Sequence, residues 1–286
     1  MSWKIIILVS AFLLSVSGIA AQKLTADEIV KKHIEAIGKS DEIAKINNQT
    51  AFGNVSFTIL RAGGVGGDGK IVISSEARKF LLGMSFQIPN YRLETIVFDG
   101  KDYKISYVMN NARSQLGNYI FRYSEILKEG LLGGVLSTGW ALRRLSETGA
   151  KIRLDGTKKI KSETGDSETE RDAYLINYVP RSGSDTEVRI FIDKENFQHL
   201  RTEYRRIISA LQGATPDASA SRRERREILI EDFSNFKRVN NLNLPQRYKI
   251  YLMIEGQSQT LEYEWKAVFS NFYFNQQLDP DSFKVK

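Results

Sequence analysis

The residues with the most recognisable chemical spacing form a glycine-rich string, Gly63 to Lys70 (GGVGGDGK). The string contains the G-x-G-x-x-G spacing, which serves nucleotide binding when a helix follows and its backbone amides face the phosphates. Here an apolar β-like run follows instead, and Ile71 stands where a phosphate-binding loop needs a hydroxyl group for magnesium. The string therefore predicts a glycine-rich hairpin turn that binds no nucleotide.

Residue types that support acid–base or nucleophilic catalysis are scarce. The chain has two histidines and no cysteine, and it lacks H-E-x-x-H and G-x-S-x-G sequences, so zinc proteolysis and the common triads have little to build on. The nearest carboxylate pairs are Asp279 with Asp281 and Glu231 with Asp232, expected in a terminal loop and a mostly exposed strand. A carboxylate-based hydrolase remains the less favoured alternative. We predict a protein that is not an enzyme and holds no metal or cofactor.

A basic run, RRERR at residues 222–226, follows the small-residue loop Gln212 to Ser221. If it pairs with the strand before the loop, its arginines form a positive ribbon suited to phosphate or carboxylate. An edge ribbon made hydrophilic by its charges is the equal alternative. No aromatic residues interleave, so nucleic acid is not a predicted partner. The arginines of this anionic-partner patch are Arg205, Arg206, Arg222, Arg223, Arg225 and Arg226.

The amino-terminal segment has the layout of a secretory signal peptide. Lys4 precedes the apolar run Ile5 to Leu14, and the small-residue stretch Ser15 to Ala21 comes next. The apolar run is shorter than the roughly 20 residues that span a bilayer. We predict a signal peptide over residues 1–21, cleaved near Ala20 or Ala21.

The remaining residues, 22–286, are expected to form a single domain outside the cytoplasm. The absence of cysteine excludes a lipid anchor on a lipobox thiol and excludes disulfides. The formal net charge of +7 favours anionic partners in general, and outside the cytoplasm lipid head groups are favoured over nucleic acid. A solvated, charge-rich surface with no specific partner is the alternative, and it is slightly favoured.

One amphipathic helix opens this domain. Thr25 and Glu28 have the spacing of a capping box, apolar residues then fall on one face, and Gly38 suits the end of the helix. His33 lies beside the apolar face, and His199 lies at the start of a later strand. Both histidines are interpreted as structural.

From Thr50 onward the repeat of apolar residues changes from about 3.6 residues, as in a helix, to 2 residues, which indicates strands. Polar residues occupy most intervening positions, a pattern typical of an antiparallel sheet with one dry face and one wet face. Lys161 to Asp172 is interpreted as a polar hairpin tip. Alternating runs begin at Val55, Phe80, Leu93, Tyr103, Tyr174, Val188, Ile228, Tyr248 and Leu261.

An apolar stretch without period 2, Leu116 to Leu145, interrupts the strands and predicts short helices packed on the dry side of the sheet. Its glycines cost up to about 1 kcal/mol each in a helix, which favours a loosely held lid. An ordinary core segment is the alternative. The glycines are Gly130, Gly133, Gly134 and Gly139.

The order of signal peptide, helix, strands, apolar helical insertion and further strands resembles the LolA-like outer-membrane lipoprotein-sorting superfamily of periplasmic carriers. The strings that carry this resemblance are Leu24 to Gly38, Glu129 to Trp140, Thr186 to Tyr204, Glu231 to Tyr248 and Asp279 to Phe283. The resemblance implies a mainly β fold with some α, in which short helices cover the concave apolar face of a strongly curved antiparallel half-barrel sheet.

The resemblance also implies binding and transport of lipid or lipoprotein acyl chains in an apolar cavity, with a membrane-bound protein as donor or acceptor. In the lipoprotein carrier an arginine inside the barrel anchors the lid, and Arg61 and Arg92 are candidates by strand position. A periplasmic sensor or regulatory module of the same fold is the alternative function. The candidate cavity and lid residues are Leu131, Leu132, Val135, Leu136, Trp140, Phe57, Ile59, Phe80 and Leu82.

Overall fold

A computed structural model describes residues 24–61, 63–109, 111–164, 167–208, 225–256 and 259–285. The signal-peptide segment, the loop from Gln212 to Ser221, and Arg222 and Arg223 lie outside the described residues. Statements below refer to the described part of the chain.

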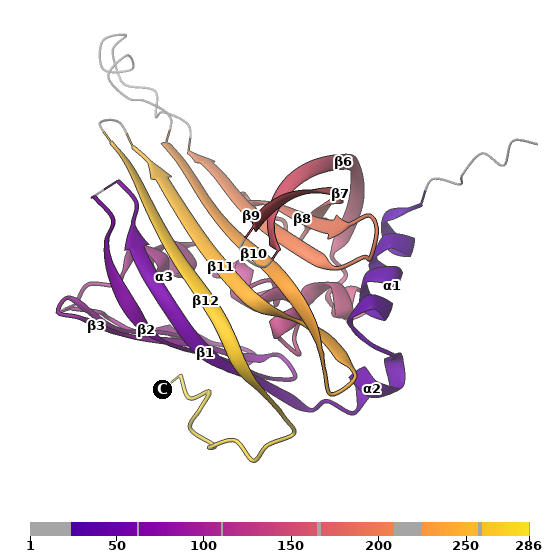
Figure 1. Cartoon of the computed structure of the whole chain (residues 1–286), viewed down its shortest axis with the longest axis horizontal. Coiled ribbons are helices and arrows are strands. Elements are labelled where there is room, and N and C mark those ends of the chain that lie inside the picture. The colour runs from indigo at the N-terminus through magenta and orange to yellow at the C-terminus, as the bar shows by residue number, and fades with distance from the viewer. Residues whose placement is uncertain are drawn as a thin grey trace, which may run out of the picture.

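The described strands form one antiparallel sheet of twelve strands in the order β5-β4-β3-β2-β1-β12-β11-β10-β9-β8-β7-β6. The edge strands β5 and β6 are not paired with each other, so the curved sheet stays open as a half-barrel (Figure 1). The strands are β1 (Asn48–Ile59), β2 (Val65–Glu76), β3 (Lys79–Ile88), β4 (Tyr91–Phe98), β5 (Tyr103–Ile105), β6 (Lys151–Thr164), β7 (Ser167–Val179), β8 (Glu187–Asp193), β9 (His199–Ile208), β10 (Arg225–Val239), β11 (Leu242–Glu255) and β12 (Thr260–Phe274).

Helices lie on one side of the sheet, as Figure 1 shows. The capping box of Thr25 and Glu28 is present at the start of the first helix, which confirms the sequence prediction. The helices are α1 (Ala26–Ile37), α2 (Ser40–Ala44), α3 (Gln115–Arg122), α4 (Glu125–Lys128) and α5 (Leu145–Thr148), with 3-10 turns η1 (Gly134–Leu136) and η2 (Ala141–Arg144). We call residues 115–148 the covering segment.

Alternation along the strands builds the core between the sheet and the covering segment. Phe57 of β1 is in register with Trp265 of β12, and Tyr248 of β11 is in register with Phe233 of β10. All four side chains are buried, because the period-2 pattern directs alternate residues to the concave face. The fold class predicted from the sequence is confirmed.

Two predicted turns differ from the structure. The string from Gly63 to Lys70 was expected to be a turn, but strand β2 begins at Val65, and Gly63 and Gly64 have positive φ just before it. A Cβ on Gly66 would lie 1.8 Å from the carbonyl oxygen of Phe57. Close backbone approach within a strand pair therefore explains this glycine.

The polar stretch from Lys161 to Asp172 is also mostly strand. Strand β6 extends to Thr164 and β7 begins at Ser167, so the tip is shorter than expected. Polar residues occupy this hairpin because much of it is exposed. No helix among the described residues is long and apolar enough to cross a membrane.

Candidate functional site

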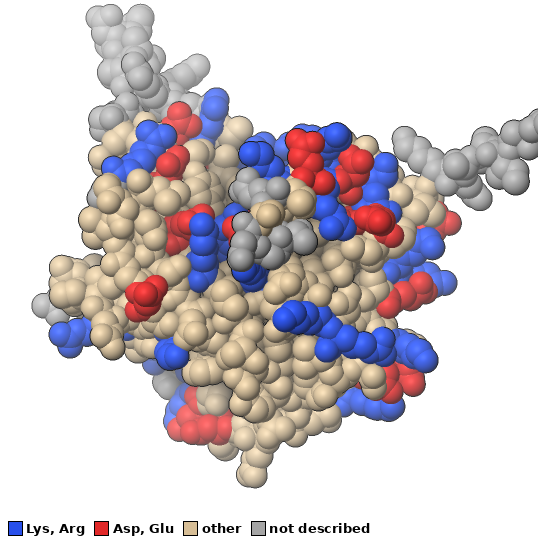
Figure 2. All heavy atoms as spheres, in the orientation of Figure 1, with Lys and Arg blue, Asp and Glu red and all other residues tan. Residues whose placement is uncertain are grey.

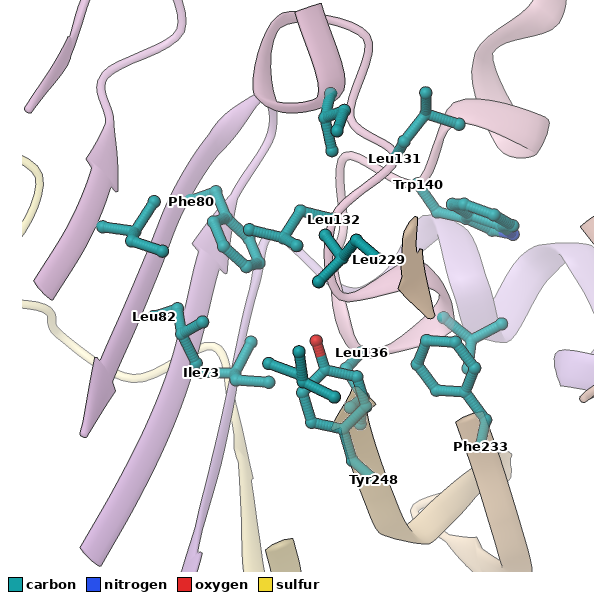
Figure 3. Close-up of a cluster of buried hydrophobic side chains, with 14 of the residues drawn as sticks. Ile73, Phe80, Leu82, Leu131, Leu132, Leu136, Trp140, Leu229, Phe233 and Tyr248 are labelled. Carbon is teal, nitrogen blue, oxygen red and sulfur yellow. The ribbon is translucent and has the colours of Figure 1, made fainter. Parts of the chain in front are cut away.

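The covering segment fills the interior of the half-barrel. Its apolar side chains meet those of β3, where Leu132 lies against Phe80, and those of β10 and β11 (Figure 3). Phe80 and Leu82 are 4% and 0% exposed. The five apolar residues predicted for the lid are at most 3% exposed: Leu131, Leu132, Val135, Leu136 and Trp140.

Three glycines of the covering segment lie in tight turns. Gly130, Gly133 and Gly134 have φ values of 75°, 78° and 47°, in the left-handed region that favours glycine. A Cβ on Gly134 would lie 2.6 Å from Cε1 of His199, and one on Gly133 would lie 2.9 Å from Cε2 of Phe80. These glycines permit tight turns against the sheet, so they indicate close packing of the segment and not loose attachment.

A buried carboxyl group holds this turn. Glu231 of β10 is 0% exposed; its Oε1 accepts a 2.7 Å hydrogen bond from the backbone N–H of Gly133, and its Oε2 accepts a 2.6 Å bond from the hydroxyl of Tyr204. The hydroxyl of Tyr248 also donates to Oε1. Loss of hydration on burial raises the pKa of Glu231 to about 7, although all three hydrogen bonds favour the charged form.

The expectation that Glu231 and Asp232 lie in an exposed strand is wrong for Glu231. The two carboxyl groups point to opposite faces of β10, because adjacent residues of a strand alternate. Asp232 pairs with Arg201 at 2.6 Å and with Lys249 at 3.1 Å on the outer face. Glu231 and Asp232 therefore do not converge on one substrate, which disfavours a hydrolase built on this pair.

A second set of contacts joins the covering segment to α1 and β9. Nε1 of Trp140 donates a 3.0 Å hydrogen bond to Nε2 of His33, and Nδ1 of His33 lies 2.9 Å from the carbonyl oxygen of Phe197. The ring of His199 stacks on Trp140 with centroids 4.7 Å apart. Burial lowers the pKa of His33 to about 4 and lowers that of His199 well below its usual value. Both histidines hold the segment as neutral rings.

An open pocket of about 380 Å³ lies at one end of the concave face. Aromatic rings form its walls: the centroid of Phe57 lies 4.8 Å from that of Tyr91 and 5.2 Å from that of Trp265. The pocket is bounded on one side by Ser114 and Gln115, at the start of the covering segment. We call it the aromatic pocket; its apolar lining includes Phe57, Ile59, Val65, Tyr91, Tyr263 and Trp265.

The polar groups of the pocket floor bond to one another. Nε1 of Trp265 donates to the hydroxyl of Tyr91 at 2.9 Å, and this hydroxyl donates to Oε2 of Glu94 at 2.7 Å. Glu94 is 0% exposed, and loss of hydration raises its pKa. The floor therefore presents aromatic faces to the pocket, while the indole N–H of Trp265 and the hydroxyl of Tyr91 are engaged in hydrogen bonds.

The structure divides the predicted cavity residues into two groups. Phe57 and Ile59 line the aromatic pocket, whereas the other seven pack together where the covering segment fills the half-barrel. Sequence reasoning missed Tyr91, Tyr263 and Arg113 as pocket residues; the alternation around Tyr263 placed it in a strand but did not indicate an open end of the sheet.

The predicted lid-anchoring arginines lie elsewhere. Arg61 is ion-paired with Glu262 of β12 at 3.2 Å, and its side chain is 60% exposed. Arg92 is exposed on β4. Glu231 contacts the covering segment instead, and accepts a hydrogen bond from the backbone N–H of Gly133.

Three described arginines of the anionic-partner patch have carboxylate neighbours. Arg205 lies 3.4 Å from Glu203, Arg206 lies 2.8 Å from Asp185, and Arg225 pairs with Glu227. Arg226 stands opposite Ile207 in the register of β10 and β9. Basic and acidic side chains are similarly interspersed on the face shown in Figure 2.

Comparison with family models finds no match, and comparison with curated proteins finds none either. Solved structures do match. A LolA superfamily protein from Nitrosomonas europaea is 15% identical with a TM-score of 0.46, and the match covers 92% of this chain and 98% of that chain. A DUF1329 family protein from Desulfovibrio piger is 11% identical with a TM-score of 0.46, covering 90% and 95%.

A third match is described as an outer-membrane lipoprotein-sorting protein domain from Vibrio parahaemolyticus. It is 11% identical with a TM-score of 0.44, covering 90% of this chain and 95% of that chain. The first and third descriptions name the superfamily that the sequence resembles. Similarity at this level does not assign a function, so the following proposal depends on the pocket and the residues around it.

Proposed function

We propose that this protein binds the acyl chain of a lipid or lipoprotein in the aromatic pocket and carries it through the periplasm, exchanging it with membrane-bound donor or acceptor proteins. The observation that supports this most strongly is the open pocket itself. Its volume of about 380 Å³ falls within the roughly 300–1,000 Å³ typical of small-ligand sites.

The chemistry of the walls favours an apolar chain. Trp265 and Phe57 are 2% and 8% exposed and belong to the main hydrophobic core, so the pocket is a surface opening of that core. An acyl chain placed there gains about 0.8 kcal/mol for each methylene removed from water. The polar groups of Trp265 and Tyr91, whose rings line the pocket, already have hydrogen-bond partners within the protein.

The covering segment offers a way to enlarge the pocket. Ser114 and Gln115 form part of the pocket wall, and Leu116, next along the chain, is fully buried. Displacement of α3 would extend the pocket toward the interior that the covering segment now fills. We therefore propose that this segment acts as a lid held by Glu231 and His33.

Binding of a fluorescent long-chain fatty acid to purified residues 22–286, called the mature chain below, tests the proposal. Val65 lines the pocket and is 60% exposed, so Val65→Asp should place a carboxylate in the opening without unfolding the domain. Val179 is 49% exposed at the end of β7 and is the matched control. We expect Val65→Asp to weaken binding about tenfold or more, as one carboxylate disfavours an apolar ligand, and Val179→Asp to bind normally. Equal affinities for both variants and the unaltered chain would contradict the proposal.

A further inference from the structure

The aromatic pocket carries a single charge. Of the described residues that line it, Arg113 alone is ionised at neutral pH, since an arginine side chain stays protonated in proteins. Arg113 precedes Ser114 and α3, so it stands where the covering segment meets the pocket. Any ligand in the pocket has this guanidinium as its charged neighbour.

No carboxylate of the described residues pairs with Arg113. Its Cζ lies 4.0 Å from the ring centroid of Phe121 and 4.7 Å from that of Tyr107. Its Nη2 makes one long hydrogen bond, 3.5 Å, to the hydroxyl of Tyr107. Its Nε is buried without a hydrogen-bond partner in the described structure. Contacts with ring faces stabilise a cation only in part and leave its N–H groups without acceptors.

Two other partly buried arginines have carboxylate partners. Arg171 lies 2.7 Å from Asp193, and Arg201 lies 2.6 Å from Asp232. In both pairs a carboxylate accepts from a partly buried guanidinium. At the aromatic pocket that partner is missing from the described residues, and the two aromatic rings hold the guanidinium beside the opening.

We propose that the aromatic pocket selects single-chain amphiphiles with an anionic headgroup, a carboxylate or a phosphate, which pairs with Arg113 while the acyl chain contacts Phe57 and Trp265. This inference depends on the proposed acyl-chain binding and specifies its ligand class. A guanidinium forms strong, charge-assisted hydrogen bonds with both headgroups. Glu94 lies beyond the hydroxyl of Tyr91 and does not line the pocket.

Competition against a fluorescent fatty acid tests the inference with three ligands of equal chain length: palmitic acid, hexadecyl phosphate and hexadecanol. With the unaltered mature chain, we expect both acids to bind about tenfold or more tightly than the alcohol. Arg113→Gln should bring the acids to the affinity of the alcohol and leave the alcohol unchanged. Comparison of the two acids distinguishes a fatty acid from a phosphorylated lipid as the preferred ligand.

Arg92→Gln is the matched control, because Arg92 is exposed on β4 and does not line the pocket. This variant should retain the preference for the two acids over the alcohol. A thermal midpoint for each variant reports folding separately. If Arg113→Gln weakens all three ligands equally, or if the preference persists in it, the inference is wrong. Equal binding of acid and alcohol by the unaltered chain would overturn this inference alone. Absence of binding by all three ligands would overturn the proposed function as well.

Discussion

Glu231 of β10 accepts a 2.7 Å hydrogen bond from the backbone N–H of Gly133, so a carboxyl group buried in the sheet holds a turn of the covering segment. The pKa of Glu231 is raised to about 7 by burial. Near neutral pH the protonated and charged forms of this group are therefore both populated, and the stability of the protein depends on pH.

We predict that the contribution of Glu231 to the free energy of unfolding falls as pH rises. Its pKa in the folded protein, about 7, lies above the ordinary value of 4.5, so its stabilising contribution is complete below about 4.5 and is lost as pH rises through about 7. The total loss amounts to at most about 3 kcal/mol. Glu231→Gln keeps an acceptor for Gly133 but does not ionise.

Urea unfolding at several pH values checks this prediction through the difference in unfolding free energy between the unaltered chain and Glu231→Gln. Subtraction removes the opposing contributions of His33 and His199, whose pKa values are lowered. The difference should fall between pH 4.5 and 7.5. A difference that stays constant over this range would show that Glu231 does not titrate there.

His33 should remain neutral well below pH 6. Its Nε2 accepts from the indole N–H of Trp140, so Nδ1 carries the proton and donates to Phe197. Protonation of Nε2 would place its N–H against the indole N–H of Trp140, which is also a donor, and would put a charge on a buried ring. The stabilising contribution of His33 is therefore present above about 6.5 and lost as pH falls through about 4. Since the chain has two histidines, NMR can follow both rings; a His33 midpoint near 6.5 would contradict the structure.

Gly134→Ala should destabilise the protein by more than about 2 kcal/mol, because it combines a positive φ with a steric clash against His199. Gly156→Ala is the matched control: Gly156 also has positive φ, 88°, but nothing lies within 4 Å of its added Cβ. That control should cost only about 1 kcal/mol. Thermal or urea unfolding compares the two variants, and equal losses would indicate that the turn has room for a methyl group.

Leu136→Ala should cost about 2–5 kcal/mol of unfolding free energy, as is usual for truncation of a buried leucine. Leu136 is 0% exposed, whereas Leu60, the control, is 40% exposed, and Leu60→Ala should change stability by less than about 1 kcal/mol. Urea unfolding measures both. A loss at Leu136 no greater than that at Leu60 would mean that the covering segment is not packed in solution as it is in the structure.

The sequence predicted the strands well where one face is uniformly apolar. Val55 and Phe57 of β1, and Phe80 and Leu82 of β3, are buried as their period of 2 predicts. The helix from Ala26 to Ile37 was predicted by its capping box. Local patterns of this kind depend on neighbours within a few residues and so are visible in one sequence.

Strand β10 shows where such reasoning fails. The alternation of Ile228 and Ile230 placed them on the dry face, but Glu227, Leu229, Glu231 and Phe233 are the buried residues. Two carboxylates occupy inward positions because partners distant in the sequence satisfy them, such as Tyr204 for Glu231. Leu229 and Phe233 are the apolar residues that indicate which side of β10 faces inward. Ile228 and Ile230 lie on the opposite side and are also apolar, so the sequence pattern alone did not reveal the inward side.

Arg113 was missed for a related reason. Its significance depends on Phe121 and Tyr107, on the absence of a paired carboxylate among the described residues, and on the pocket formed with β1 and β12. No regular spacing in the sequence predicts any of these relationships. A contact to the covering segment was likewise expected from arginines, whereas in the structure a glutamate bonds to its backbone.

Photocrosslinking with a long-chain fatty acid that carries a diazirine near its terminal methyl group tests the central claim most directly. Labelled peptides from the purified mature chain would be located by mass spectrometry. Binding in the aromatic pocket predicts labels on Phe57, Tyr91, Tyr263 or Trp265, and it predicts that Val65→Asp removes them while Val179→Asp does not. Labels confined to the outer face of the sheet, or labels unchanged by Val65→Asp, would contradict acyl-chain binding in this pocket.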